Sequence, residues 1–311
     1  MSKDIMLVSS VPTFMMNDLQ QEYVLHDHAH ILDPEAFTKV TAFVGFGSTA
    51  KVDRKLLAMF PNVKMISIFG VGYDGIDVAA AQERGIQVTH TPDVLTDDVA
   101  DLAMGLILSI GRRIPQSDKF VRNADWVSEP FTMTHKVTGT RLGVVGLGRI
   151  GQAIAKRAAA FDMTIAYTGR RAKTNAPFRY YPTASELAAN SDYLVVAVPG
   201  GDDTKNMINA QVLKALGPKG IVINIARGSV VDQTALIQAL KDKSIAGAGL
   251  DVFWDEPNID PQFFKLQNVV LTPHNGSNTH ETRRAMADLA LANLKAFFEE
   301  RPLLTLIPEC Q

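Results

Sequence analysis

The sequence is poor in cysteine, nearly neutral and free of long apolar runs. Its single cysteine, Cys310, excludes an intrachain disulfide framework and a zinc cluster built on several cysteines. The net charge of -2 gives no support for a nucleic-acid partner or an anionic membrane. No apolar stretch reaches the ~18 residues of a membrane span, and residues 1–10 lack a cleavage-like tail of a secretory signal. These absences predict a cytoplasmic protein with neither a nucleic-acid nor a membrane partner.

What is present is the pattern of an α/β protein. A hydrophobic fraction of 46% and a charged fraction of 21% are typical of a globular chain, and 311 residues predict about two domains. Short apolar runs alternate with helical stretches, which indicates mostly parallel sheets. The predicted strands fall within residues 5–10, 42–48, 65–70, 86–90, 141–148, 163–169, 193–200, 220–228, 246–253 and 268–274.

The strand and helix alternation is interrupted once. A helical stretch over residues 96–121 ends the first set of strands, and the alternation restarts near residue 141. We therefore expect two doubly wound parallel-sheet domains, with the last helix returning to the first of them. The expected domains are residues 1–98 with 285–311, and residues 99–284.

A glycine-rich turn lies at the start of the second set of strands. The run GLGRIG follows an apolar strand and opens a helix, the context in which G-x-G-x-x-G binds a dinucleotide pyrophosphate. Its glycines permit a tight turn and close approach of the backbone, and the helix N-terminus supplies free N–H groups. The predicted cofactor-binding residues here are Gly146, Leu147, Gly148, Arg149, Ile150 and Gly151.

The acidic residue that usually follows this turn is absent. Roughly 20 residues downstream, where a carboxylate would hold the adenosine ribose hydroxyls, the chain has Thr168, Gly169, Arg170 and Arg171. An acid here would repel the 2′-phosphate of NADP, whereas guanidinium groups bind phosphate through a bidentate fork. The sequence therefore predicts NADPH as the preferred cofactor and leaves use of NADH open.

Three polar residues follow predicted strands of the same domain. Arg227 ends IVINIARG, Glu256 follows GLDVFWDE and His274 ends VVLTPH. The carboxyl ends of parallel strands meet at one edge of a sheet, which is where such sheets bind ligands. Each residue alone could be a surface side chain, but the three together with a dinucleotide fingerprint predict an active site.

These motifs resemble those of the D-2-hydroxyacid dehydrogenases, and within them the glyoxylate/hydroxypyruvate and hydroxyphenylpyruvate reductases. The resemblance covers nearly the whole chain and is carried by SIFGVGYDGIDV, TPDVLTDDVADLAMGLIL, GVVGLGRIGQAIAKRAAAF, INIARGSVVD, GAGLDVF and LTPHNGS. It implies two Rossmann- or flavodoxin-like domains, one substrate-binding and one dinucleotide-binding, with the active site in the cleft between them, and a homodimer.

The resemblance also implies roles for individual residues. The catalytic set matches Arg227, Glu256 and His274, with Arg227 also binding substrate. The substrate carboxylate would bind backbone amides around Val71 and Gly72. Asp251 would contact the nicotinamide amide, and the YTGRR stretch is similar to that of NADP-preferring members. The roles of Tyr73 and Trp254 in substrate selection stay open.

The chemistry of these side chains fits reduction of a small 2-oxo acid such as glyoxylate or hydroxypyruvate. His274 as imidazolium can donate a proton to the carbonyl oxygen, and Glu256 favours the charged imidazole. Arg227 can bind the carboxylate and polarise the carbonyl; no metal is needed. The alternatives are a reductase of hydroxyphenylpyruvate or another bulkier 2-oxo acid and, more remotely, a dinucleotide-sensing corepressor-like binding protein.

One segment fits neither domain pattern. Residues Asp125 to Thr140 have mixed polarity and no period, yet they contain Trp126, Phe131 and Met133. Such side chains are too apolar for a free loop, so we expect this segment to pack on a second copy of the chain. The family resemblance suggests that its tip reaches the neighbouring active site.

Overall fold

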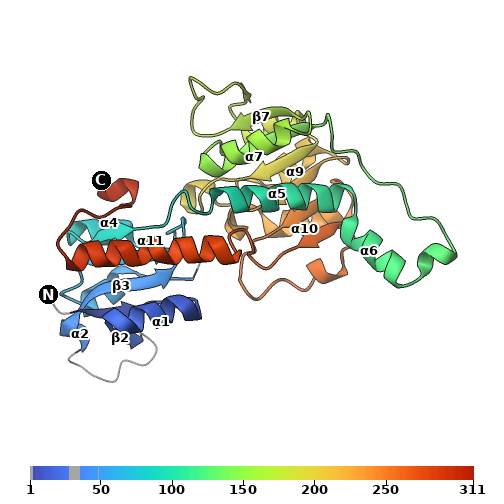
Figure 1. The fold of residues 1–311 in the computed structure, drawn as a ribbon. Helices are drawn as coiled ribbons and strands as arrows, with labels where there is room; N and C mark the ends of the chain where they lie inside the picture. Colours follow the sequence, from blue (N-terminus) through green and yellow to red (C-terminus); the bar gives the residue numbers. More distant parts are fainter. Residues whose placement is uncertain (1–2, 28–35, 48) are drawn as a thin grey trace. The chain divides into compact units, whose positions relative to one another are not determined.

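The computed structural model describes residues 3–27, 36–47 and 49–311. The chain divides into two compact units, Met1–Leu95 with Thr279–Gln311, and Thr96–Asn278. Both divisions fall at the start of a helix, whereas the expected boundaries at 98/99 and 284/285 lie inside those helices. Each helix is one cooperative piece of structure, so it belongs whole to a single unit (Figure 1).

Unit 1 is built on a parallel sheet of order β2-β1-β3-β4-β5 in the described part of the chain. This is the flavodoxin-like doubly wound order. β3 is the central strand and β4 lies beside it. β4 is fully buried and β3 is buried up to Phe46, which is partly exposed, as expected for a parallel sheet covered on both faces. The strands are β1 Asp4–Leu7, β2 Val24–Asp27, β3 Val40–Phe46, β4 Met65–Phe69 and β5 Gln87–Thr89.

The helices of unit 1 include one from the far end of the chain. α11 packs on β4, and Ile307, which follows it, is fully buried in the core of this unit. The segment is held there by a bridge between Thr89 and Leu306. The helices are α1 Thr13–Glu22, α2 Ala36–Lys39, α3 Arg54–Met59, α4 Val78–Glu83 and α11 His280–Phe298, followed by the 3-10 turn η6 Pro308–Cys310.

Unit 2 contains a parallel sheet of order β12-β11-β10-β9-β6-β7-β8 in the described residues. The chain runs outward from β6 in one direction and then restarts at β9 on its other side, the Rossmann arrangement. Both sheets confirm the predicted α/β, doubly wound class. The strands are β6 Arg141–Val145, β7 Thr164–Thr168, β8 Arg179–Tyr180, β9 Tyr193–Val196, β10 Ile221–Asn224, β11 Gly247–Leu250 and β12 Val269–Leu271.

The helices of unit 2 form two groups, because right-handed crossovers on the two sides of a switch point place helices on opposite faces. α5 packs with α7, and α9 packs with α8 and α10. The helices are α5 Thr96–Gly111, α6 Ile114–Arg122, α7 Arg149–Ala159, α8 Ala184–Ala189, α9 Ala210–Leu216 and α10 Gln233–Lys241. Short 3-10 turns are η2 Asp125–Val127, η3 Asp202–Thr204, η4 Gly228–Val230 and η5 Phe263–Lys265.

The single helix expected over residues 96–121 is wrong. It breaks between α5 and α6, where Arg113 adopts a left-handed conformation with φ of 50°. Pro115 follows in the first turn of α6, where it has no N–H to continue the backbone hydrogen bonds of α5. A proline therefore ends the apolar periodicity that otherwise continues through this stretch.

The strand prediction also missed β2 and β8. β2 has the mixed sequence VLHD with a partly exposed pattern, and β8 is two residues long, so neither has an apolar run to detect. Ser48, the last residue of a predicted strand, lies outside the described residues. In the part of the chain that the structure describes, no helix combines the length and apolarity needed to span a bilayer.

Candidate active site

The glycine-rich turn lies at the switch point of the unit 2 sheet. β6 pairs with β7 on one side and β9 on the other, and the turn follows directly after β6. Gly146 has a φ of 97°, and Gly151 packs against the Gly146 carbonyl. Gly148 begins α7 without a side-chain cap, and a Cβ there would meet open space. An uncapped helix N-terminus beside an open glycine fits a pyrophosphate.

The side chains of the two arginines after β7 are exposed to solvent. Arg170 and Arg171 follow the buried end of β7, and neither has a hydrogen-bond or ion-pair partner among the described residues. A Cβ on Gly169 would also meet nothing within 4 Å. A cavity of about 150 Å³ adjoins this loop, and residues of the glycine-rich turn and α7 complete its wall. It is lined by Leu147, Gln152, Lys173, Asn175, Ala176, Pro177 and Phe178.

The turn after β10 presents Arg227. Buried Asn224 braces this turn, because its amide nitrogen donates to the Arg227 carbonyl at 2.9 Å and its oxygen accepts from the Ala226 N–H at 3.1 Å. The next residue, Gly228, lies so close to the following loop that a Cβ would come within 2.0 Å of the Phe253 carbonyl carbon. Only glycine permits this approach, which brings the Arg227 turn against the loop that contains Glu256.

Glu256 and His274 form a hydrogen-bonded pair. Glu256 Oε2 lies 2.7 Å from His274 Nδ1, and Glu256 Oε1 accepts from the Phe253 N–H at 2.9 Å. An ionised carboxylate can only accept, so Nδ1 carries a proton and Nε2 is the nitrogen left for proton exchange. The two side chains are 28% and 29% exposed, which leaves the pair within reach of a ligand.

The surroundings of Glu256 stabilise its ionised form. Burial alone would raise the pKa of this carboxyl, but hydrogen bonds from His274 and the Phe253 N–H, with the positive charge of Arg227, lower the pKa below its usual value. The positive charges of His274 and Arg227 therefore both stabilise the Glu256 carboxylate. The arrangement can hold a proton on an imidazole next to a fixed negative charge.

Asp251 is the clamp of the His274 turn. Its buried carboxylate accepts from Thr272 Oγ1 at 2.6 Å and from the N–H groups of Asn275 at 2.7 Å and Gly276 at 2.9 Å. Its carbonyl also accepts from the His274 N–H at 2.9 Å. Burial raises the pKa of Asp251, and the three donors oppose that rise. This carboxylate therefore fixes the conformation of the turn, in which His274 has a φ of 53°.

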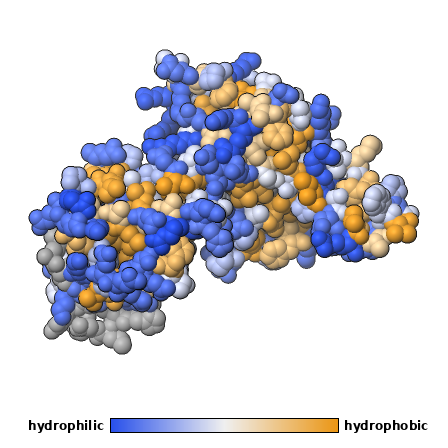
Figure 2. Space-filling view, viewed as in Figure 1, coloured by the Kyte–Doolittle hydropathy of each residue, from blue (hydrophilic) through white to orange (hydrophobic). Residues whose placement is uncertain are grey.

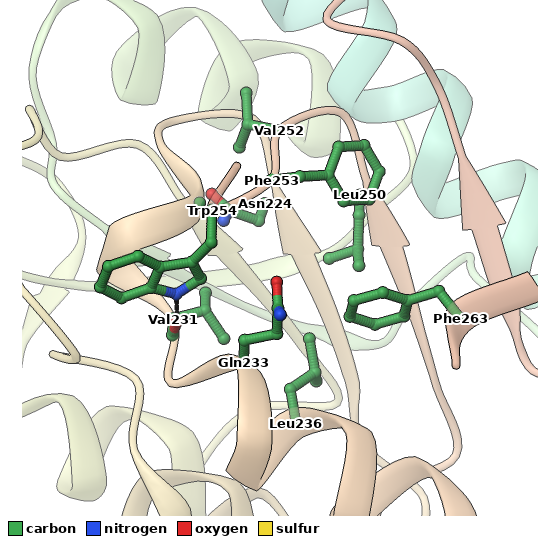
Figure 3. Close-up of a pocket in the computed structure, with 10 residues that line it drawn as sticks. Asn224, Val231, Gln233, Leu236, Leu250, Val252, Phe253, Trp254 and Phe263 are labelled. Atoms are coloured by element: carbon green, nitrogen blue, oxygen red, sulfur yellow. Dashed lines mark hydrogen bonds between the residues drawn. The ribbon is translucent and has the colours of Figure 1, made fainter. Parts of the chain in front are cut away.

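A small cavity lies behind the Phe253–Trp254 loop (Figure 3). The Trp254 indole N–H donates to the Val231 carbonyl at 2.9 Å, and the Gln233 amide points into the cavity. Its volume of about 10 Å³ is at most that of one water molecule, so a 2-oxo acid does not fit there. Trp254 is 40% exposed, and the Lys205 Nζ lies over its ring, 5.8 Å from the ring centroid.

Two of the predicted site residues belong to unit 1. Val71 and Gly72 follow β4, and their N–H groups, with that of Tyr73, donate no hydrogen bond to any described residue. The buried His90 steadies this loop by a contact of 3.0 Å between its Nδ1 and the Val71 carbonyl. The loop thus offers free backbone donors, as an anion-binding segment requires.

The sequence interpretation missed the residues that support the site. Asn224 and Thr272 hold the turns that carry Arg227 and His274, and the Phe253 N–H holds the Glu256 side chain. Asn224 and Thr272 could have been identified from the sequence, because a polar residue at the end of a buried apolar strand needs a hydrogen-bond partner. The Phe253 N–H could not, because any residue supplies that donor.

Comparisons with known proteins identify the family of this chain. The family described as D-isomer specific 2-hydroxyacid dehydrogenase, NAD binding domain, matches residues 104–276. A hydroxyphenylpyruvate reductase from Plectranthus scutellarioides is 51% identical over 266 residues, which cover 86% of this chain and 85% of that protein. A glyoxylate/hydroxypyruvate reductase from Arabidopsis thaliana is 44% identical over 306 residues, 97% of each chain.

A solved structure is similar over the entire chain. It is the NADPH-dependent glyoxylate/hydroxypyruvate reductase SmGhrB from Sinorhizobium meliloti, in complex with NADP and malonate. Its TM-score is 0.94 at 41% sequence identity, and the match covers 100% of this chain and 98% of that one.

Proposed function

The chain belongs to the D-isomer specific 2-hydroxyacid dehydrogenase family, and we propose that it reduces glyoxylate and hydroxypyruvate to the corresponding 2-hydroxy acids with NADPH. The observation that carries this proposal is the pair of Glu256 and His274, joined at 2.7 Å and within electrostatic range of Arg227. A nicotinamide dinucleotide, when bound, supplies the hydride that reduces C2 of the oxo acid. The glycine-rich turn and the uncapped start of α7 are the residues that would hold its pyrophosphate.

The protein's own groups supply the proton and the charge stabilisation. His274 donates the Nε2 proton to the carbonyl oxygen as negative charge develops there. Glu256 holds Nδ1 and compensates the imidazolium before transfer. Arg227 polarises the carbonyl through its guanidinium, and we assign to the amides of Val71 and Gly72 a hold on the carboxylate. For Asp251 a contact to the nicotinamide amide stays a proposal beside its observed clamp of the His274 turn.

Preference for NADPH is the finer part of the proposal. It is supported by the two exposed arginines after β7 and by the absence of a carboxylate at that position. The NADP-bound relative from Sinorhizobium meliloti is consistent with it. Gly169, Arg170 and Arg171 are the residues that would face the 2′-phosphate.

Steady-state assays test the proposal. Loss of NADPH absorbance with glyoxylate or hydroxypyruvate would support it, and a panel with pyruvate and hydroxyphenylpyruvate would rank the substrates. Hydroxyphenylpyruvate is the second candidate because the relative from Plectranthus scutellarioides is named for that reaction. If kcat/KM for hydroxyphenylpyruvate exceeds that for glyoxylate, the substrate assignment is wrong. If no 2-oxo acid is reduced, the proposed function falls.

We further propose a homodimer, formed through α6 and residues 125–140, in the cytoplasm. α6 has no buried residue, and this part of the chain exposes Ile114, Val121, Trp126, Val127 and Met133, the last at 97% (Figure 2). A second copy would cover this apolar surface, and the tip of the segment would reach the partner's active site. Multi-angle light scattering at micromolar protein tests this, since a monomer would contradict it.

A further inference from the structure

Two aromatic rings form a platform at the carboxyl edge of the unit 1 sheet. Phe46 ends β3 and Phe69 ends β4, and the two are paired in register with ring centroids 5.3 Å apart. Phe69 is fully buried and is followed directly by the loop that contains Val71 and Gly72. The Gly47 N–H donates to the Phe69 carbonyl at 3.0 Å, so the ends of both strands and this loop form one continuous edge.

Arg283 of α11 lies over this platform. Its guanidinium carbon is 4.8 Å from the centroid of the Phe46 ring and 5.6 Å from that of Phe69. Stacking occupies the face of a guanidinium and leaves its N–H edge free for hydrogen bonds. The platform therefore positions a planar cation at the start of the Val71–Gly72 loop without consuming its donors.

The charge of Arg283 has no counterion among the described residues of this unit. Its buried Nε has no hydrogen-bond partner, and the side chain makes no ion pair with a described carboxylate. Its neighbour Arg284 pairs with both Asp18 and Asp288. Burial lowers the pKa of Arg283, as expected for a cation withdrawn from water without an anion. A half-buried cation with an unpaired, buried Nε is unfavourable, so this placement points to a ligand that pairs with it.

The free donors beside Arg283 are of the same kind. The N–H groups of Val71, Gly72 and Tyr73 donate to no described residue, as noted above. Backbone amides in succession and a guanidinium edge both bind a small oxyanion. The loop amides and the Arg283 guanidinium therefore suit the same kind of ligand, a small oxyanion, although they are about 200 residues apart in the chain.

We propose that Arg283 is a substrate-binding residue, which binds the carboxylate of the 2-oxo acid together with the N–H groups of Val71 and Gly72. This inference rests on the proposed function, because the oxo acid is the ligand. The inference assigns different parts of the substrate to the two arginines. Arg283 holds the carboxylate equally in the ground and transition states, whereas Arg227 acts on the carbonyl oxygen where charge develops.

Kinetics of two neighbouring arginine variants test the division. Arg283→Gln keeps a planar polar group but loses the charge, and Arg284→Gln is the matched control on the same helix. We expect Arg283→Gln to raise KM for glyoxylate and hydroxypyruvate at least ~10-fold, the effect of losing a hydrogen bond to a charged group. Its kcat should change less than about threefold and KM for NADPH should be unaltered, as for uniform binding. Arg284→Gln should keep the wild-type KM for both acids.

A binding measurement separates this inference from the proposed function and from a purely structural role. Malonate titrated into the full-length protein by calorimetry, without cofactor, should bind wild type and Arg284→Gln more tightly than Arg283→Gln. If wild type reduces no 2-oxo acid, the proposed function fails while the titration still reports anion binding. An active Arg283→Gln variant with wild-type KM and wild-type malonate affinity overturns the inference, even if its melting temperature is lower, and Arg283→Lys repeats the test where the glutamine variant does not fold.

Discussion

The Glu256–His274 pair and the arginines after β7 lie along the same carboxyl edge of one sheet, but they are built differently. Glu256, His274 and Asp251 are held by hydrogen bonds of 2.6 to 2.9 Å that link the loop after β11 with the loop after β12. Arg170 and Arg171 are exposed and have no partner in the described chain. One region is fixed before any ligand binds, and the other offers charge without a fixed geometry.

This difference bears on how much each region can contribute to the reaction. Donors held in place need no reorganisation when charge develops, so they stabilise a transition state strongly. Exposed charges lose much of their interaction to water, salt and side-chain entropy. We therefore expect substitutions in the fixed pair to change the rate by large factors, and substitutions in the exposed loop to change cofactor choice by small ones.

The largest effect is expected for His274→Ala. Removal of the proposed proton donor should lower kcat for glyoxylate reduction at least ~100-fold, the lower end for a lost general acid. His280→Ala, an exposed histidine at the start of α11, is the control and should keep the wild-type rate. A His274→Ala variant with kcat within a few fold of wild type would show that another group delivers the proton.

Arg227→Lys should follow. The change keeps the charge but loses the planar fork, so it should cost ~2 kcal/mol or more in transition-state binding, roughly 30-fold in kcat/KM. The exposed Arg122, paired with Asp118, provides the control variant Arg122→Lys. Near-wild-type kcat/KM in Arg227→Lys would remove this arginine from the site.

The same contrast explains what the sequence could predict. Arg227, Glu256 and His274 could be predicted to lie at one edge because strand ends of a parallel sheet converge, a rule that needs only the apolar pattern. The hydrogen bonds of Asp251 depend on the left-handed conformation of His274 and on the N–H groups of Asn275 and Gly276. Neither feature can be predicted from the type of residue at these positions. Two features of the fold were missed because the hydrophobic pattern does not record them. β2 is a short strand of mixed polarity, and the break at Arg113 precedes a proline inside a stretch with helical spacing of apolar residues.

Glu256→Gln should shift the pH dependence of the reaction. The variant loses the anion that favours the imidazolium, so the alkaline limb of kcat/KM for reduction should move to lower pH. An unmoved limb with full activity would exclude Glu256 as the partner of His274.

Glu256 should also affect stability as a function of pH. Its pKa is lowered in the folded protein, so its contribution is present above the unfolded pKa and is lost as pH falls through the folded pKa. The difference in melting temperature between wild type and Glu256→Gln should accordingly shrink on acidification. A difference that stays constant from neutral to acid pH would mean that the glutamine acts through packing.

The smallest effect is expected in the exposed loop. A charge pair at 4 Å is worth ~4 kcal/mol at an effective dielectric of about 20, but the solvent exposure of Arg170 and Arg171 reduces this to ~1 kcal/mol, roughly fivefold in cofactor preference. Replacing both by alanine should therefore weaken NADPH about fivefold, leave NADH nearly unchanged, and abolish the salt dependence of the preference. Gly169→Asp has room for its side chain and should go further, since a carboxylate repels the 2′-phosphate and accepts from the ribose hydroxyls. If wild type uses NADH as well as NADPH at low salt, the two arginines are surface charges, and only the fixed region of this edge selects its ligand.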